Sequence, residues 1–279
     1  MTKAFVIGHP IAHSRSPLIH GFWLREHGLA GSYERIDVPP DELAGFLTTF
    51  AERGFVGGNV TVPHKEAVFR LVPASTERAQ RLGAVNTLRA MPDGSLLADN
   101  TDGIGFAENV ADAIGPGWAG EVSSALVLGA GGAARAILGA LLEHGIPRIR
   151  VANRNPDRAA DLARFDPDRV EAIAWNAREA ALAGTDLVVN TTSLGMTGQP
   201  PLDLDLSALG PSGIVADIVY VPLVTPLLER ARARGLRTVE GLGMLLHQAV
   251  PGFEAWFGTR PRVTGELRAL VEADVEGRR

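Results

Sequence analysis

The sequence predicts an α/β chain of two domains, one of them built on a parallel sheet. Short runs of β-branched residues alternate with longer stretches rich in Ala and Leu, which is typical of parallel strands joined by helices. The chain has 279 residues, 46% of them hydrophobic, so it can bury a large core. At roughly 100–200 residues per domain, this length predicts two domains.

The first unit is predicted to begin with three strands and two helices. The strands are expected at residues 4–8, 31–38 and 57–62, and the helices at 17–27 and 41–53. Alternating apolar residues indicate the strands, and apolar residues three or four apart indicate the helices.

The second unit is predicted to begin with a strand near Ser124. The preceding segment, 115–120, has the Pro and Gly content of a loop, so a boundary is expected between 103 and 123. A later helix is expected at 244–257, where Pro251 should kink or split it. We therefore predict domains at 1–103 and 104–240, with a helical segment, 241–279, returning to the first.

Composition argues against several classes of protein. The chain has no cysteine, so it forms no disulfide or thiolate metal site, which suits a reducing compartment. With 27 basic and 32 acidic residues, the formal charge of −5 argues against a nucleic-acid surface. The apolar start is too short for a signal peptide, and the longest apolar stretch, 124–142, contains Arg135. We expect a cytoplasmic protein that binds neither nucleic acid nor membranes.

No metal site is expected either. The seven histidines include no His-Glu-x-x-His pair, and His9, His13 and His20 fall on different predicted elements.

A glycine-rich turn predicts a dinucleotide site in the second unit. Residues 124–135 read as a strand, a turn and a helix start that matches G-x-G-x-x-[G/A], with Ala134 in the third place. Gly129 permits a tight turn, Gly131 lets the backbone approach a pyrophosphate, and free amides at the helix start bind its oxygens. The alternative is a glycine-rich turn that only leads into a helix.

The end of the next strand predicts NADP as the cofactor. The strand at 148–153 ends at Asn153, near the position where an NAD enzyme carries a carboxylate for the ribose hydroxyls. Arg154 and Arg158 follow instead, and guanidinium groups bind a phosphate in a bidentate manner. The alternative is that both arginines are solvated surface charges.

Another buried strand, at 185–190, runs into a polar loop. Its carboxyl end should face the ligand crevice of an open parallel sheet. Thr191, Thr192 and Ser193 are therefore candidate ligand contacts, or else residues that cap a turn.

The first unit carries its polar residues in four short motifs. These are HSRSP at 13–17, NVTVPHK at 59–65, GAVNT at 83–87 and NTDG at 100–103. In this order and spacing they resemble the shikimate dehydrogenase family. The resemblance spans 7–257 and includes 129–135, 153–154 and GLGMLLHQ at 241–248.

The resemblance implies an NADP-dependent enzyme that reduces 3-dehydroshikimate to shikimate, with a substrate domain at 1–103 and an NADP domain at 104–240. It implies that Lys65 is the general acid, with Asp102 as its partner. Hydride arrival at a ketone builds negative charge on oxygen, and an ammonium group stabilises that charge. The substrate contacts it implies are Ser14, Ser16, Asn59, Thr61, Asn86, Asp102, Tyr220 and Gln248. The cofactor contacts are Gly129, Ala130, Gly131, Gly132, Ala133, Asn153, Arg154, Arg158, Thr191, Ile218, Gly241 and Met244.

Each of these residues also has a structural explanation. Lys65 alone would be a surface charge, Asp102 would be a helix N-cap, and Ser14 or Ser16 before Pro17 would start a helix. Their joint occurrence favours the catalytic interpretation.

The chain departs from the family's usual residues at Gly21, Asn155 and Ile218, and the last of these concerns nicotinamide packing. The alternatives are a quinate or quinate/shikimate dehydrogenase, which tends to prefer NAD, and a non-catalytic NADP-binding regulator. The expected ligand partners are small molecules, and the expected assembly is a monomer or homodimer.

Overall fold

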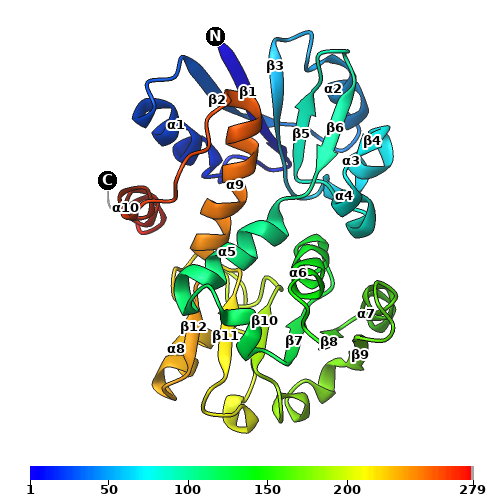
Figure 1. The fold of residues 1–279 in the computed structure, drawn as a ribbon, viewed down its shortest axis with the longest axis vertical. Coiled ribbons are helices and arrows are strands. Elements are labelled where there is room, and N and C mark those ends of the chain that lie inside the picture. Colours follow the sequence, from blue (N-terminus) through cyan, green and yellow to red (C-terminus); the bar gives the residue numbers. More distant parts are fainter. Residues whose placement is uncertain (278–279) are drawn as a thin grey trace. The chain divides into compact units, whose positions relative to one another are not determined.

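The computed structural model describes residues 1–277, which form two compact units (Figure 1). Unit 1 comprises Met1–Asp102 and Gln248–Val271, and unit 2 comprises Gly103–His247 and the chain from Glu272 onward. Each unit contains one six-stranded sheet among the described residues. The assignment of substrate and NADP to separate domains stays a prediction, and residues 278 and 279 of the predicted C-terminal segment lie outside the described residues.

The sheet of unit 1 is mixed, with strand order β2-β1-β3-β5-β6-β4. Strand β1 pairs in parallel with β2 and β3, whereas β5 is antiparallel to both β3 and β6. The strands are β1 Thr2–Gly8, β2 Gly31–Asp37, β3 Phe55–Val60, β4 Ala74–Ser75, β5 Thr87–Ala90 and β6 Leu96–Asp99.

The three strands predicted in this unit pair in parallel, whereas the antiparallel strands β5 and β6 were not predicted. The turn between β5 and β6 contains Pro92-Asp93-Gly94, and Gly94 has a φ of 83°. Asp93 accepts hydrogen bonds from the backbone and hydroxyl of Ser95 at 2.9 and 2.6 Å. A turn this short joins only antiparallel strands, so these local residues select the hairpin.

The helices of unit 1 cover an aromatic core. They are α1 Ser16–Glu26, α2 Leu43–Thr49, α3 Lys65–Leu71 and α4 Glu77–Leu82, so α2 is shorter than the predicted helix at 41–53. Phe5 of β1 packs edge-on against Phe46 and Phe50, with ring centroids 5.1 Å away in each case. Such edge-to-face contacts fix the position of β1, whose carboxyl end leads into the polar loop at 13–17.

The sheet of unit 2 is parallel throughout, with strand order β12-β11-β10-β7-β8-β9, and it confirms the predicted dinucleotide-binding architecture. The chain reverses direction of winding between β7 and β10, and ligands bind at such a switch point. The strands are β7 Ser124–Leu128, β8 Arg148–Asn153, β9 Val170–Ala174, β10 Leu187–Asn190, β11 Ile214–Asp217 and β12 Arg237–Val239.

Helices cover both faces of this sheet. Val127 of β7 packs in one core with Ile137 of α6, and its neighbour Leu128 packs in a second core with Leu227 of α8. This alternation follows from the two-residue period of a strand. The helices are α6 Gly132–Glu143, α7 Pro156–Ala163 and α8 Pro226–Ala233, with 3-10 turns at Trp118–Glu121, Trp175–Ala177, Ala180–Leu182 and Leu206–Ala208.

Three helices contribute residues to both units: α5 (Asp102–Ile114), α9 (Gly241–Phe257) and α10 (Gly265–Val275). Helix α9 runs through Pro251 without a break, so the predicted split is wrong. Ala249 and Phe253 are completely buried on either side of the proline, and this packing holds the helix together despite the lost backbone hydrogen bond. Within residues 1–277, no helix is long and apolar enough to cross a membrane.

Candidate active site

The structure gathers the predicted substrate residues of unit 1 at the ends of its strands and the starts of its helices. Asn59 lies in β3 and Thr61 follows it, Lys65 is the first residue of α3, Asn86 precedes β5, and Asp102 opens α5. Gln248 comes from α9, far along the chain, and belongs to the same unit.

Lys65 and Asp102 form an ion pair, with Nζ and Oδ2 separated by 2.5 Å. The side chains are 18% and 7% exposed, so the pair is largely shielded from water. The other carboxylate oxygen of Asp102 accepts a hydrogen bond from Asn86 Nδ2 at 2.8 Å. Each oxygen therefore has a donor, and the ammonium group still has two N–H bonds to offer.

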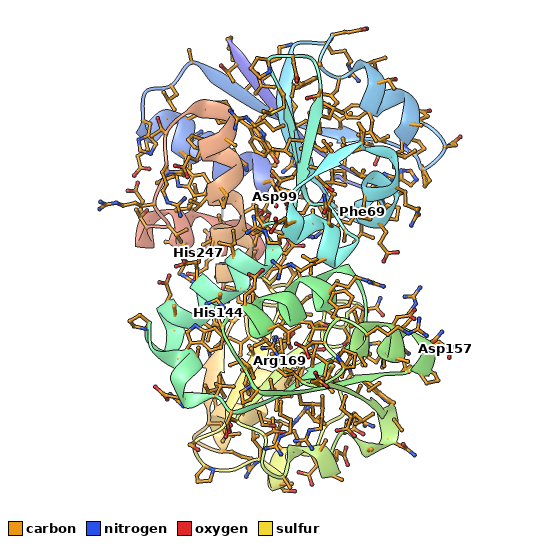
Figure 2. All side chains as sticks on the ribbon, turned by 45° about the vertical axis from the view of Figure 1, so that its right-hand side comes forward. Phe69, Asp99, His144, Asp157, Arg169 and His247 are labelled. Atoms are coloured by element: carbon orange, nitrogen blue, oxygen red, sulfur yellow. The ribbon has the colours of Figure 1, made fainter. Side chains whose placement is uncertain are left out.

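Asp102 does not act as the N-cap of α5, since it is the first helical residue and its carboxylate accepts from Lys65 and Asn86. Its backbone N–H donates instead to Asn100 Oδ1 at 3.1 Å. The loop before it is held by Asp99 at the end of β6 (Figure 2), which accepts from Thr76 Oγ1 at 2.6 Å and from Arg78 at 2.7 Å.

Asn86 connects this pair to α9. Its amide nitrogen lies 3.0 Å from Thr101 Oγ1 and 3.3 Å from Gln248 Oε1, and its amide oxygen accepts from the backbone N–H of Thr101 at 2.8 Å. Thr101 Oγ1 in turn donates to the carbonyl of Gln248 at 2.8 Å. Gln248 is thereby held beside the residues that precede α5, although 162 positions separate it from Asn86.

Asn59 is held from the opposite side by Tyr33 of β2. The Tyr33 hydroxyl donates to Asn59 Oδ1 at 2.6 Å, and Asn59 Nδ2 donates to the carbonyl of Asn86 at 3.1 Å. Burial raises the pKa of Tyr33 well above its usual value, so its hydroxyl stays protonated as a donor. His20 stacks on Tyr33 at a centroid distance of 4.0 Å, and burial lowers the pKa of His20 to about 3, so the ring is neutral.

The two predicted serines lie where β1 passes into α1. The backbone N–H of Ser16 faces Ser14 Oγ at 3.4 Å, and the carbonyl of Ser14 accepts from Arg35 Nε at 2.7 Å. Arg15 is the N-cap residue of α1, and its side chain does not cap the helix. Ser14 Oγ accepts the N–H of the first helical residue only at this long distance. Thr61 donates its backbone N–H to the carbonyl of Ile7 at 2.9 Å, which ties its loop to β1.

In unit 2, the glycine turn lies at the switch point between β7 and β10. Gly129 has a φ of 113°, and a Cβ there would lie 2.4 Å from Thr191 Oγ1. Thr191 Oγ1 donates to the carbonyl of Leu128 at 2.7 Å, so this contact is fixed. Both the backbone conformation and the space require glycine.

The turn leads into α6 with Gly131 at the N-cap and no side chain capping the helix. The first amides of the helix, those of Gly132 and Ala133, have no acceptor within the helix and are available to phosphate oxygens. Ala130, buried at 7% exposure, lies between the two glycines of the turn. These residues fit the pyrophosphate of a dinucleotide.

Arg154 and Arg158 flank the start of α7, and both are exposed. Within residues 1–277, neither guanidinium group forms a hydrogen bond or ion pair. Asn155 caps α7 by accepting from the backbone of Asp157 at 2.9 Å. Figure 2 shows Asp157 at the outer edge of this helix. Asn153 is held by a 2.9 Å bond from its Nδ2 to the carbonyl of Asn155.

Three more predicted cofactor residues lie together in unit 2. A Cβ on Gly241 would lie 2.5 Å from the backbone of Ile218, so α9 starts against the loop that follows β11. Met244, 9% exposed, packs in the same core as Ile218. Tyr220 follows in that loop and belongs to unit 2, unlike the other predicted substrate residues.

Sequence reasoning missed several residues that hold the site together. Tyr33 and Thr101 connect the predicted substrate residues, and Asn190 and Asp217 connect the loops at the ligand edge of unit 2. Asn190 and Asp217 are polar residues that end buried strands. A polar residue at the carboxyl end of a buried strand is the signal that indicated Thr191, and it could also have indicated these two residues.

Three family profiles match the chain. They are the shikimate dehydrogenase substrate binding domain at residues 6–88, shikimate / quinate 5-dehydrogenase at 113–196, and the shikimate 5'-dehydrogenase C-terminal domain at 241–265.

Known proteins resemble the chain over almost its full length. Shikimate dehydrogenase (NADP(+)) from Methylobacterium radiotolerans is 58% identical over 276 residues, covering 99% of this chain and 98% of the relative. The crystal structure of shikimate 5-dehydrogenase from Thermus thermophilus in complex with NADP(H) and shikimate is 38% identical, with a TM-score of 0.84 over 98% of this chain and 100% of that one. Quinate dehydrogenase from Corynebacterium glutamicum in complex with NAD is 33% identical, with a TM-score of 0.89 over 97% of this chain and 98% of that one. The chain belongs to the shikimate dehydrogenase family.

Proposed function

We propose that this chain catalyses the reversible reduction of 3-dehydroshikimate to shikimate with NADPH, and that Lys65 and Asp102 are its catalytic pair. The observation that carries the proposal is the shielded ion pair, with Asn86 bound to the second carboxylate oxygen. Relatives at 54–58% identity are NADP-dependent shikimate dehydrogenases, which supports the same reaction and cofactor.

In the reduction, Lys65 Nζ supplies the proton. NADPH, when bound, supplies the hydride that reduces the substrate ketone. Negative charge then develops on the ketone oxygen, where a hydrogen bond from the Lys65 ammonium stabilises it. The proton passes from Nζ to this oxygen, and the 18% of the side chain that remains exposed lets solvent restore the ammonium.

Asp102 orients the ammonium. Its Oδ2 faces Nζ and its Oδ1 faces Asn86 Nδ2, so the carboxylate cannot turn away without losing a hydrogen bond. We assign it a second role as acceptor for a substrate hydroxyl, because a carboxylate oxygen accepts more than one hydrogen bond.

The remaining polar residues bind the substrate. Hydroxyl donors suit its carboxylate, and we assign this role to Ser14, Ser16, Thr61 and Tyr220. Amides suit its ring hydroxyls because they both donate and accept hydrogen bonds. Asn86 Nδ2 faces three acceptors with two hydrogens, so the longest contact, 3.3 Å to Gln248, is the easiest for a substrate hydroxyl to replace. Asn59 and Gln248 complete this group.

We assign the pyrophosphate of NADP to the turn at Gly129–Ala133, and its 2′-phosphate to Asn153, Arg154 and Arg158. The two arginines are exposed and unengaged within the described chain, so binding a phosphate breaks no existing ion pair. Thr191, Ile218, Gly241 and Met244 are assigned to the nicotinamide end of the site.

A spectrophotometric assay tests the proposal directly. Shikimate and quinate are each supplied with NADP and with NAD, and the appearance of reduced cofactor is followed. We expect the highest kcat/KM for shikimate with NADP. Faster turnover of quinate with NAD would favour the quinate dehydrogenase alternative, and NADP binding without turnover of either substrate would favour the regulator.

A further inference from the structure

The residue that holds the nicotinamide end of unit 2 together is a buried carboxylate with no assigned role. Asp217 is the last residue of β11, is 2% exposed, and accepts three hydrogen bonds. Its Oδ1 accepts from Asn190 Nδ2 at 2.9 Å and from the backbone of Val219 at 3.0 Å, and its Oδ2 accepts from Thr225 Oγ1 at 2.7 Å.

These bonds tie both ends of one loop to a single carboxylate. Val219 lies at the start of loop 218–225 and Thr225 at its end, where Thr225 caps α8 by accepting from the backbone of Leu228. Between them lie Tyr220 and the Val221–Pro222 peptide. Ile218 opens the same loop. Its backbone donates to the carbonyl of Asn190 at 3.1 Å.

The hydrogen bond from Asn190 to Asp217 connects loop 218–225 to the loop that follows β10. Asn190 is paired with Asp217 in the sheet register, and its Oδ1 accepts from the backbone and hydroxyl of Thr192 at 3.0 and 2.7 Å. Its Nδ2 also donates to the carbonyl of Leu194 at 3.1 Å. Farther along, Thr197 donates its backbone N–H to the carbonyl of Val221 at 2.8 Å.

We propose that Asp217 is a positioning residue that, through Asn190 and Thr225, fixes loops 191–197 and 218–225 and so sets where Ile218 and Tyr220 meet the nicotinamide and the substrate. The proposal rests on the function proposed above, because those two residues carry its nicotinamide and substrate contacts. A displacement of about 1 Å in such a site lowers turnover about 10²-fold, even when the changed residue does not touch the reacting atoms.

A carboxylate serves this role better than any uncharged side chain. Three donors converge on it, two at one oxygen and one at the other. Asparagine keeps the first oxygen and can place its amide nitrogen against Thr225 Oγ1, which has a lone pair to accept with. Alanine leaves all three donors without an acceptor. Asp217→Asn should therefore retain much of the geometry that Asp217→Ala loses.

The chain contains a matched control at the amino-terminal ends of the same strands. Asp186 precedes β10, and its Oδ2 also accepts three hydrogen bonds, from Ser123 N at 2.8 Å, Ser123 Oγ at 2.8 Å and Ser124 N at 3.0 Å. Because the strands are parallel, Asp186 lies at their amino ends and Asp217 at their carboxyl ends. Asp186→Ala therefore removes a similar set of hydrogen bonds at the opposite end of the strands from the proposed cofactor contacts.

Two readouts test the proposal. Hydrogen–deuterium exchange on the cofactor-free protein should show faster exchange of 191–197 and 218–225 in Asp217→Ala, but not in Asp186→Ala. Steady-state kinetics should show kcat lowered about 10- to 100-fold and the KM for NADP raised in Asp217→Ala, with both constants near wild type in Asp186→Ala. Asp217→Asn should lie between wild type and Asp217→Ala.

A folded Asp217→Ala protein whose exchange and kinetics match those of Asp186→Ala would overturn the proposal. If Asp217→Ala does not fold, Thr225→Val removes one donor and Thr225→Ser keeps it. The proposal then requires faster exchange of 218–225 and a higher KM for NADP in the valine variant only, and equal behaviour of the pair overturns it. Failure of the wild type to oxidise shikimate would instead remove the proposed function, while the exchange experiment still reports on Asp217.

Discussion

The Tyr33 hydroxyl donates a 2.6 Å hydrogen bond to Asn59 Oδ1, and this bond holds the Asn59 amide in one orientation together with the bond from Asn59 Nδ2 to the carbonyl of Asn86. Asn59 Nδ2 faces the carbonyl of Asn86, which only accepts, so the amide oxygen must face Tyr33. A buried aromatic residue of β2 thereby orients a proposed substrate contact of β3.

Tyr33→Phe should weaken substrate binding without changing the cofactor site. The ring and its stacking with His20 are kept, but Asn59 Oδ1 loses its donor, so the amide is held less firmly by the remaining bond from Nδ2 to Asn86. We expect the KM for shikimate to rise about three- to tenfold, the equivalent of one ordinary hydrogen bond. Steady-state kinetics at saturating NADP check this, and the dissociation constant of NADP serves as the internal control. Equal KM values for shikimate in the variant and the wild type would show that Tyr33 does not act through Asn59.

Arg154→Asp should select against NADP. A carboxylate at this position repels a 2′-phosphate, and the loss of a charge-assisted hydrogen bond is worth about 1.5–3 kcal/mol, or one to two orders of magnitude in affinity. Binding of NAD, which lacks the phosphate, should change little. Titration of both cofactors measures the two dissociation constants.

Arg164→Asp is the matched control for that variant, because it makes the same charge change beyond the other end of α7, where Arg164 pairs with Asp161 at 3.1 Å. It should leave the affinity for NADP near that of the wild type. Parallel changes in NADP and NAD binding in Arg154→Asp would argue against the proposed phosphate site.

Asp217 should also make stability depend on pH. Burial, partly opposed by bonds from Thr225, Val219 and Asn190, raises its pKa from 3.8 to about 6. The folded protein therefore binds this proton more tightly than the unfolded chain, so the contribution of Asp217 to stability is full below pH 3.8 and is lost as the pH rises through about 6. The loss is on the order of 3 kcal/mol.

Asp217→Asn removes this titration. Urea unfolding of both proteins between about pH 4 and pH 7 gives the difference in their free energies of unfolding, and other carboxylates cancel from that difference. We expect the wild type to lose stability relative to the variant across this range. A difference that does not vary with pH would mean that Asp217 titrates outside it.

The sequence predicted best the features that depend on neighbouring residues. The turn at Gly129 and Gly131 is defined by the strand before it and the helix after it, and β8 has the predicted bounds Arg148–Asn153. The hairpin of β5 and β6 also depends on neighbouring residues, since Pro92-Asp93-Gly94 signals its turn. It was not predicted because its strands are only four residues each and show little periodicity.

Features that depend on distant residues could not be predicted from patterns alone. Lys65 and Asp102 lie 37 positions apart, which gives no spatial distance, and the expectation that they act as partners came from the family resemblance. The bond between Asn190 and Asp217 depends on the register of β10 and β11, which is fixed only when the sheet forms. Pro251 lies within an unbroken helix because the surrounding packing outweighs a local propensity.

The catalytic pair is the central claim, and variants of it should behave as one unit. Lys65→Ala removes the donor to the developing charge, so turnover should fall more than substrate binding. Asp102→Asn should lower turnover and also raise the KM for shikimate, because we assign the carboxylate a contact with a substrate hydroxyl. The effects in the double variant should be less than additive.

The most direct test is the kcat of Lys65→Ala at saturating shikimate and NADP, with Lys3→Ala as the control. Lys3 is the other lysine of the chain, and its ammonium lies 5.5 Å from the Phe55 ring centroid. We expect kcat to fall about 10²- to 10⁴-fold in Lys65→Ala, with NADP affinity unchanged, and to stay near wild type in Lys3→Ala. A folded Lys65→Ala protein that binds NADP and turns over shikimate at a rate close to that of Lys3→Ala would contradict the assignment.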